Sequence, residues 1–283
     1  MSRRRPAALR LALCVALVVC AVAVADRTPA AAAGPGYWLV RSDGVVLNYG
    51  GAADHGDTGG GVPDPIPAIA AMRTGAGYWL AARNGVVYVF GDAPFLGSPA
   101  GRPLPAPIVG MASTPTDRGY WLTGSDGSIS NFGDAGHHGS FAGSRLNAPM
   151  LAMASTTTGR GYWMVAADGG IFSFGDAAFH GSTGAMKLNK PVVGMEPTPS
   201  GRGYWLVATD GGIFSFGDAA FHGSTGSMRL NSPIVGMASN ADGSGYWLVA
   251  ADGGVFAFGN VGFHGSAGGE PQPAPIVDVV ASR

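Results

Sequence analysis

Short apolar runs separated by turn signals recur along the chain with a period of 41 or 42 residues. In a clean copy that begins at Pro191, these runs cover Val192 to Glu196, Tyr204 to Ala208, Ile213 to Phe216 and, more weakly, Ala220 to Gly223. Runs of four or five residues bounded by Gly, Pro and Asp are typical of β-strands. The pattern therefore predicts a unit of four short strands.

Both faces of the second predicted strand are apolar. Tyr204 and Leu206 point to one side of this strand, while Trp205 and Val207 point to the other. A sheet with one face in water would alternate apolar with polar residues. A small sheet that is buried on both faces needs a neighbour on each side, and radial stacking of similar sheets supplies both neighbours.

A Gly-Tyr-Trp triplet marks each copy and contains all six tryptophans of the chain. It begins at Gly36, Gly77, Gly119, Gly161, Gly203 and Gly245. Between the second and third runs every copy carries Asp-Gly or Asn-Gly, which supplies the positive φ angles of a two-residue hairpin turn. Four-stranded propeller repeats commonly have a period of roughly 40–45 residues. We therefore predict an all-β fold, a six-bladed β-propeller with four antiparallel strands per blade.

The two ends of the repeat region have complementary phase. The first copy begins with the second strand of a blade, Gly36 to Val40, whereas the last run, Ile276 to Val280, aligns with first strands such as Ile234 to Met237. We expect this C-terminal strand to complete the sixth blade and to close the ring, because closure removes exposed sheet edges.

Residues 1–25 have the features of a secretory signal peptide. Four arginines precede an apolar run of about 15 residues, and Ala-Val-Ala stands before Asp26. An uncleaved anchor is the alternative, although the run is shorter than the roughly 20 residues of a spanning helix. We expect a signal peptide in residues 1–25, a short linker in 26–35 and the propeller in 36–283. After cleavage no transmembrane segment would remain, and the protein would be secreted or associated with the cell surface.

Composition narrows the choice of partners. Removal of the four arginines of the signal leaves 13 Lys and Arg against 18 Asp and Glu, a net charge of about −5. Nucleic acid is therefore a poor candidate and is not expected as a partner, because phosphate binding needs a basic surface. Cys14 and Cys20, the only cysteines, are both part of the signal, so we expect neither disulfides nor cysteine metal ligands in the mature protein.

The string G-Y-W-L-V-A-x-D-G-G-I-F-S-F-G-D-A-A-F-H-G-S, followed by P-I-V-G-M-A, resembles the repeats of secreted actinobacterial β-propeller proteins. In period and aromatic placement it is more distantly similar to kelch-like and WD-type propellers. The resemblance extends from Gly36 to Ser282. It implies a fold and an extracellular setting, and it implies no activity.

The repeated polar and aromatic residues have structural interpretations. Four histidines share one position before Gly-Ser, and residues on different blades lie too far apart to bind one metal ion: His138, His180, His222 and His264. The triplet tryptophans fit packing between blades better than stacking on sugars, since a ligand site usually breaks symmetry. Asp before Gly is explained by turn chemistry rather than by a calcium loop. We therefore expect no metal site and no cofactor.

The connections from each fourth strand to the next blade break the symmetry. They carry the candidate ligand-binding residues Arg102, Arg145, Lys187, Lys190 and Arg229. Propeller topology places these loops on one face together with the Asp-Gly turns, which would give a basic arc on an acidic protein. Solvated surface charge is the alternative interpretation. Loops on a rigid scaffold are preferred binding sites, and an anionic cell-wall polymer or an acidic protein surface would suit this arc.

The sequence favours an exported, monomeric, non-catalytic binding or scaffold protein, with a protein or a cell-wall polysaccharide as its ligand. The alternative is an extracellular hydrolase or lyase with an active site on the propeller axis. Glu196 and Glu270, the only glutamates, belong to different blades. The sequence contains neither a Gly-x-Ser-x-Gly elbow nor a phosphate-binding loop, so it predicts no catalytic residue.

Overall fold

The computed structural model of the protein describes residues 34–282, and this part contains 18 β-strands and no helix. The expected signal peptide, residues 1–25, and most of the expected linker lie outside the described residues. Within the described part, no helix is long and apolar enough to cross a membrane.

The strands form six antiparallel sheets of three strands each. Five of these sheets follow the order of the chain and are named here by their first strand: β3–β4–β5 (Ala68–Ala71, Gly77–Ala81, Val87–Gly91), β6–β7–β8 (Ile108–Ser113, Gly119–Gly124, Ile129–Gly133), β9–β10–β11 (Met150–Ser155, Gly161–Ala166, Ile171–Gly175), β12–β13–β14 (Val192–Pro197, Gly203–Ala208, Ile213–Gly217) and β15–β16–β17 (Ile234–Ser239, Gly245–Ala250, Val255–Gly259). The sixth, the β18 sheet, joins the two ends of the described chain: β18 (Ile276–Ser282), β1 (Gly36–Arg41) and β2 (Val46–Gly50).

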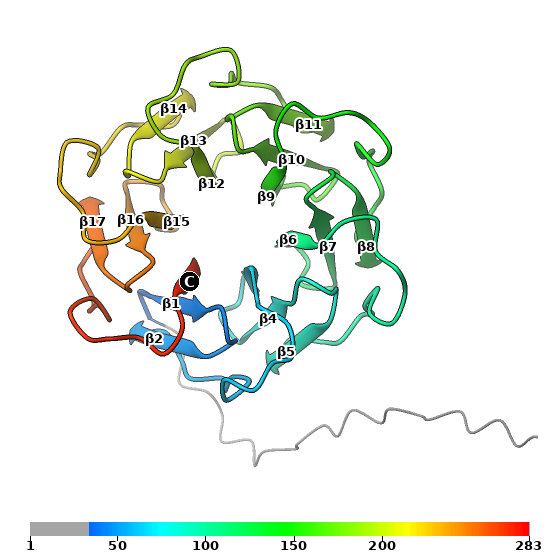
Figure 1. Ribbon diagram of the computed structural model, residues 1–283, viewed down its shortest axis with the longest axis horizontal. Coiled ribbons are helices and arrows are strands. Elements are labelled where there is room, and N and C mark those ends of the chain that lie inside the picture. Colours follow the sequence, from blue (N-terminus) through cyan, green and yellow to red (C-terminus); the bar gives the residue numbers. More distant parts are fainter. Residues whose placement is uncertain (1–33, 283) are drawn as a thin grey trace, which may run out of the picture.

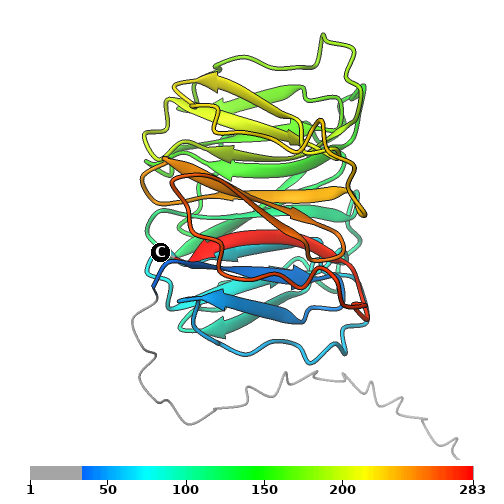
Figure 2. The ribbon, with the colours of Figure 1, turned by 90° about the vertical axis from the view of Figure 1, so that its left-hand side faces the viewer.

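The six sheets surround a common axis in a propeller-like arrangement, with the first strand of each sheet innermost (Figure 1). Seen from the side, the strands run across the thickness of the ring from one face to the other (Figure 2). β18 pairs with β1 from Gly36 opposite Ser282 to Val40 opposite Asp278. The C-terminal strand therefore occupies the position that the phase of the repeat predicts.

The prediction of four strands per sheet is wrong, since the structure has three. The fourth run, called here the outer run, makes no ladder with the third strand. In the β12 sheet its Ala220 carbonyl accepts a hydrogen bond from Trp205 Nε1 at 2.7 Å, and its Gly223 carbonyl accepts one from the Tyr246 hydroxyl at 2.6 Å. Gly223 has a φ of +137°, outside the strand region. Side chains thus satisfy backbone groups that a fourth strand would have paired.

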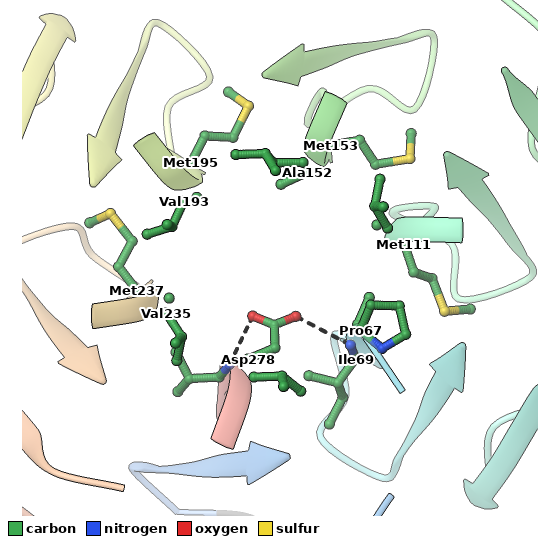
Figure 3. A pocket seen from close by; sticks show the side chains of 18 of the residues that line it. Pro67, Ile69, Met111, Ala152, Met153, Val193, Met195, Val235, Met237 and Asp278 are labelled. Carbon is green, nitrogen blue, oxygen red and sulfur yellow. Dashed lines mark hydrogen bonds between the residues drawn. The ribbon is translucent and has the colours of Figure 1, made fainter. Parts of the chain in front are cut away.

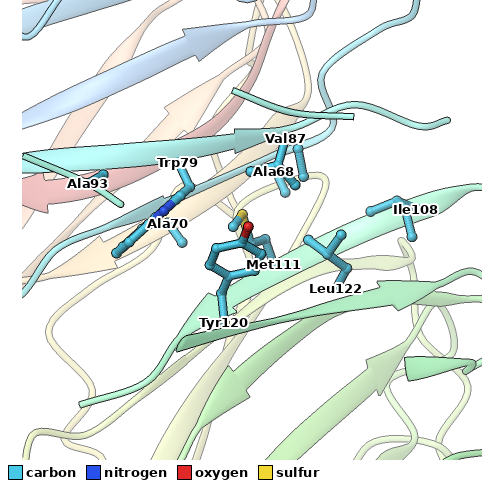
Figure 4. Packing of buried hydrophobic residues seen from close by; sticks show 10 residues of the cluster. Ala68, Ala70, Trp79, Val87, Ala93, Ile108, Met111, Tyr120 and Leu122 are labelled. Atoms are coloured by element: carbon cyan, nitrogen blue, oxygen red, sulfur yellow. The ribbon is translucent and has the colours of Figure 1, made fainter. Parts of the chain in front are cut away.

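The aromatic triplets form the contacts between neighbouring sheets. Trp79 of the β3 sheet packs against Tyr120 of the β6 sheet with ring centroids 5.7 Å apart, beside Met111 and Leu122 (Figure 4). All six triplet tryptophans are at most 3% exposed. The interpretation of these aromatic residues as core is therefore confirmed.

Replacement of Tyr204 by Phe is expected to destabilise the protein by about 1–3 kcal/mol. The Tyr204 hydroxyl donates to the Gly181 carbonyl at 2.6 Å and accepts from the His180 N–H at 3.1 Å, so its loss leaves two backbone groups unpaired. Urea denaturation measures the effect. Tyr49→Phe is the matched control, because the Tyr49 hydroxyl has no hydrogen-bond partner among residues 34–282. Equal midpoints for the two variants would contradict the role of Tyr204.

Candidate functional site

The five predicted site residues are all exposed and lie at one end of the sheets. We call this end the loop face: it contains the Asp-Gly or Asn-Gly turns and the loops that enter each innermost strand. Arg102 precedes β6, Arg145 precedes β9, Lys187 and Lys190 precede β12, and Arg229 precedes β15. These residues thus lie on four consecutive sheets of the ring. Within the described chain, none of them takes part in an ion pair.

Backbone hydrogen bonds fix these loops to the turns of the same face. Thr183 N donates to the Gly169 carbonyl at 3.1 Å, and Met186 N donates to the Thr183 carbonyl at 2.8 Å. In the next loop Met228 N makes the equivalent bond to the Thr225 carbonyl at 2.8 Å. Thr183 and Thr225 are fully buried. The loops are therefore held in place before any ligand binds.

Large apolar side chains are exposed beside the basic residues. Met186 is 57% exposed next to Lys187, and Met228 is 53% exposed next to Arg229. Four phenylalanines at one position of the outer runs are 61–62% exposed: Phe95, Phe179, Phe221 and Phe263. The exposure of these residues was not predicted, because apolar residues inside a repeat were interpreted as core. Neighbouring exposed apolar groups are typical of interaction surfaces.

The opposite end of the sheets, called here the hairpin face, carries the loops between the first and second strands. There Asp176 accepts hydrogen bonds from Thr156 at 2.9 Å and Thr158 at 2.5 Å, and Arg160 lies 3.6 Å away. Partial burial acts to raise the pKa of Asp176, but these hydroxyl bonds and the arginine charge outweigh it and hold the pKa below its usual value. The equivalent groups on the β6 and β12 sheets repeat this cluster, with Arg118 and Arg202 in the place of Arg160.

The repeated histidines pack between sheets. His222, for example, lies 5.3 Å from the ring of Tyr246 on the next sheet, in an edge-to-face arrangement. His55, His138, His180 and His264 contact tyrosines at 5.5–5.8 Å. This packing confirms the structural interpretation of the histidines. Residues 34–282 contain no group of three or more His, Cys, Asp or Glu side chains that could hold a metal ion.

The repeated acidic turn residues are occupied within their own turns. Asp168, Asp210 and Asp252 each accept a hydrogen bond through Oδ1 from the backbone N–H two residues later, at 2.9–3.0 Å. The interpretation of these carboxylates as turn residues is therefore confirmed. Each bond leaves the second carboxylate oxygen available on the loop face.

The innermost strands line a channel along the axis of the ring. A cavity of ≈150 Å³ lies among aliphatic side chains and has Asp278 and Glu196 in its wall (Figure 3). It adjoins a wider cavity of ≈340 Å³ that extends towards the hairpin face, where Arg73 and Thr156 lie in the wall. Glu196 belongs to the walls of both cavities. Among residues 34–282, no basic side chain lines the smaller cavity.

Asp278 points into this channel and is held by backbone groups of two strands. Its Oδ1 accepts from the N–H of Val279 at 2.8 Å, and its Oδ2 accepts from the N–H of Ile69 on β3 at 3.2 Å (Figure 3). Burial, with a smaller contribution from the negative charge of Glu196, raises the pKa of Asp278 to about 7 against the lowering effect of the two hydrogen bonds. Glu196 itself accepts from the Ser239 hydroxyl at 2.9 Å. The channel therefore holds a carboxyl group that gains or loses its proton near neutral pH.

The two axial carboxyl groups break the repeat, and this signal could have identified them from the sequence. The other five sheets carry only small residues at the position of Asp278: Ala68, Gly110, Ala152, Gly194 and Gly236. Glu196 likewise stands where the other sheets have Ala or Val. The predicted site residues came from asymmetry in the loops alone, so neither of these carboxyl groups was among them.

No protein-family model matches this chain, and no curated protein matches it. The assignment of a function therefore depends on the surfaces and cavities described above.

Proposed function

We propose that the protein is a non-catalytic binding scaffold that acts outside the cell or at its surface, built as a closed six-bladed propeller whose loop face contacts the ligand. The observation that carries this proposal is the set of exposed basic and apolar side chains on the fixed loops of that face. An anionic cell-wall polymer or an acidic protein surface matches this set. The secretory signal in residues 1–25 and the resemblance to secreted actinobacterial repeat proteins support the location.

The loop face has two properties that favour binding. Its basic groups have no carboxylate partner within 34–282, so they keep their full charge for a ligand. Its loops are already hydrogen-bonded in one arrangement, so less conformational entropy is lost when a ligand binds. Exposed charges at such a surface mainly raise the association rate and make affinity depend on salt.

Replacement of Arg145, Lys187 and Arg229 by alanine is expected to weaken binding to cell-envelope preparations of the source organism by about tenfold at low salt. The reason is the loss of three exposed charges on neighbouring sheets. A pull-down titration of the purified protein against insoluble envelope material measures the change, and the wild-type affinity should fall as salt rises.

The hairpin face offers a matched control for this experiment. Arg118, Arg160 and Arg202 are also on neighbouring sheets, are 78–80% exposed and form only long ion pairs of 3.4–3.9 Å. Their triple alanine variant changes the net charge by the same amount on the opposite face. If both triple variants bind alike, the loop face is not the binding surface.

One observation favours the second candidate, a hydrolase with an axial site. Asp278, with a pKa of about 7, lies near Glu196, and a protonated carboxyl beside an ionised one is the arrangement that general acid catalysis uses. The ≈150 Å³ around Asp278 admits only a very small group. A panel of glycan and peptidoglycan substrates tests this candidate: turnover that Asp278→Asn abolishes would support it over the binding scaffold.

A further inference from the structure

A groove lies on the loop face of the β15 sheet. It is lined by Leu230, Asn231 and Ser232, in the segment that enters β15, and by Phe263 of the outer run. The hairpin between β16 and β17 also lines it. The volume of the groove is ≈360 Å³, within the roughly 300–1,000 Å³ of small-molecule sites.

The groove combines aromatic rings with polar groups that have spare hydrogen-bonding capacity. Phe263 is 61% exposed, and Phe256, which also lines the groove, is partly exposed. Asp252 uses Oδ1 for the N–H of Gly254 at 3.0 Å, and its Oδ2 has no hydrogen-bond partner among the described residues. Asn231 is exposed and presents an amide that both donates and accepts.

These groups are complementary to a pyranose ring. The face of an aromatic ring carries partial negative charge and attracts the polarised C–H bonds of the apolar face of a sugar. A carboxylate oxygen accepts hydrogen bonds from hydroxyl groups, and a side-chain amide both donates to and accepts from them. A phosphate or another small anion would be repelled by Asp252, and a purely apolar ligand would leave the carboxylate without a partner.

The same set of residue types recurs on the neighbouring sheet. In the β12 sheet the corresponding residues are Asn189, Asp210, Phe214 and Phe221. The β9 sheet carries the set as well, with Asn147, Asp168, Phe172 and Phe179, although there Phe141 packs edge-on against Phe172 at 4.5 Å. The β6 sheet lacks it, because Pro105, Ser130 and His137 replace the amide and both rings. Repeated sites on one face suit a polymer with repeated units, since linked sites gain avidity.

We propose that the groove of the β15 sheet, together with the corresponding residues of the β12 sheet, binds neutral pyranose units of a polysaccharide, while Lys187 and Arg229 beside them bind anionic substituents of the same polymer. This inference rests on the proposed function, because it names the ligand class of the same loop face. It adds a sugar-specific contact to a surface that otherwise acts through charge.

The experiment is saturation-transfer NMR on the purified protein with three neutral tetrasaccharides, built of N-acetylglucosamine, mannose and glucose. At least one of them should bind. The double variant Phe221→Ala and Phe263→Ala should weaken that binding by about tenfold, through the loss of ring contacts. Phe95→Ala is the matched control: Phe95 is as exposed as Phe263, at 61%, but Pro63 stands where its sheet would need the groove asparagine. It should change the affinity by less than about twofold.

The outcomes separate this inference from the proposed function. Absence of binding by all three tetrasaccharides, equal binding by the double variant, or binding of an acidic peptide instead would each overturn the sugar groove. In those cases, a loss of envelope binding in the alanine variant of Arg145, Lys187 and Arg229 would still support the proposed function. Conversely, sugar binding that persists in that basic variant would support the groove even if the charged surface contributes nothing.

Discussion

A protein that lacks residues 275–283 is expected to be largely unfolded under conditions in which the intact protein is folded. The deletion removes β18, which pairs with β1 along its whole length and buries Ile276 and Val279, at 0% and 3% exposure. The deletion removes two buried side chains and one ladder, and it exposes the edge of β1. We expect it to lower the free energy of unfolding by more than about 5 kcal/mol. This is comparable to the entire stability of many domains.

Thermal unfolding followed by circular dichroism measures the effect of the deletion. Ile276→Ala serves as a graded control, because it keeps the ladder and removes only buried apolar volume, for an expected loss of about 2–4 kcal/mol. Its melting temperature should therefore lie between those of the intact and shortened proteins. A shortened protein that melts with the intact one would show that β18 contributes nothing to the stability of the ring.

Stability is expected to fall by on the order of 4 kcal/mol as the pH rises from about 4 to about 7, because of Asp278 alone. The pKa of this group rises from its ordinary value of 3.8 to about 7 in the folded protein, chiefly through burial. Between these two values the folded state binds more protons than the unfolded state, so a rise in pH favours unfolding. The stabilising effect of the proton is complete below pH 4 and is lost above pH 7.

Urea denaturation between pH 4 and pH 8 measures this dependence, and Asp278→Ala isolates it. Alanine is the residue that the β3 and β9 sheets carry at this position. The variant should lose the decline between pH 4 and pH 7. The lowered pKa values of Asp176 and Asp218 reduce stability as the pH falls, and only below about pH 4. They therefore do not mask the decline that Asp278 causes between pH 4 and pH 7. Parallel profiles for the variant and the wild type would exclude Asp278 as the source.

The sequence predicted the number of sheets, three strands of each sheet and the position of the C-terminal strand. The period, the Asp-Gly turns and the two apolar faces of strands such as β13 are local signals, and each has a direct structural consequence. The fourth strand was predicted wrongly because its run has the composition of a short β-strand. Whether such a run joins a ladder depends on side chains of other strands, here Trp205 and Tyr246, which take over its carbonyl groups.

The candidate sites were predicted less completely. Exposure of Lys187 and Arg229 follows from their loops, and the structure places them on the expected face. The direction of Asp278 could not be predicted from alternation, because the pairing of β18 with β1 shifts register between Val40 and Arg41. Such a shift changes which side chains face the axis. The groove could not be predicted from the sequence, because Asn231 and Phe263 are about 30 positions apart and their proximity depends on the path of the outer run.

The most direct test of the proposed function is amide hydrogen exchange of the protein with and without bound cell-envelope polymer. Binding on the loop face predicts slower exchange in the loops of residues 182–191 and 224–233, which contain Lys187 and Arg229. The loops of residues 114–118 and 156–160 on the hairpin face should exchange at unchanged rates. Protection confined to the hairpin face, or to the strands that line the axial channel, would contradict the proposal.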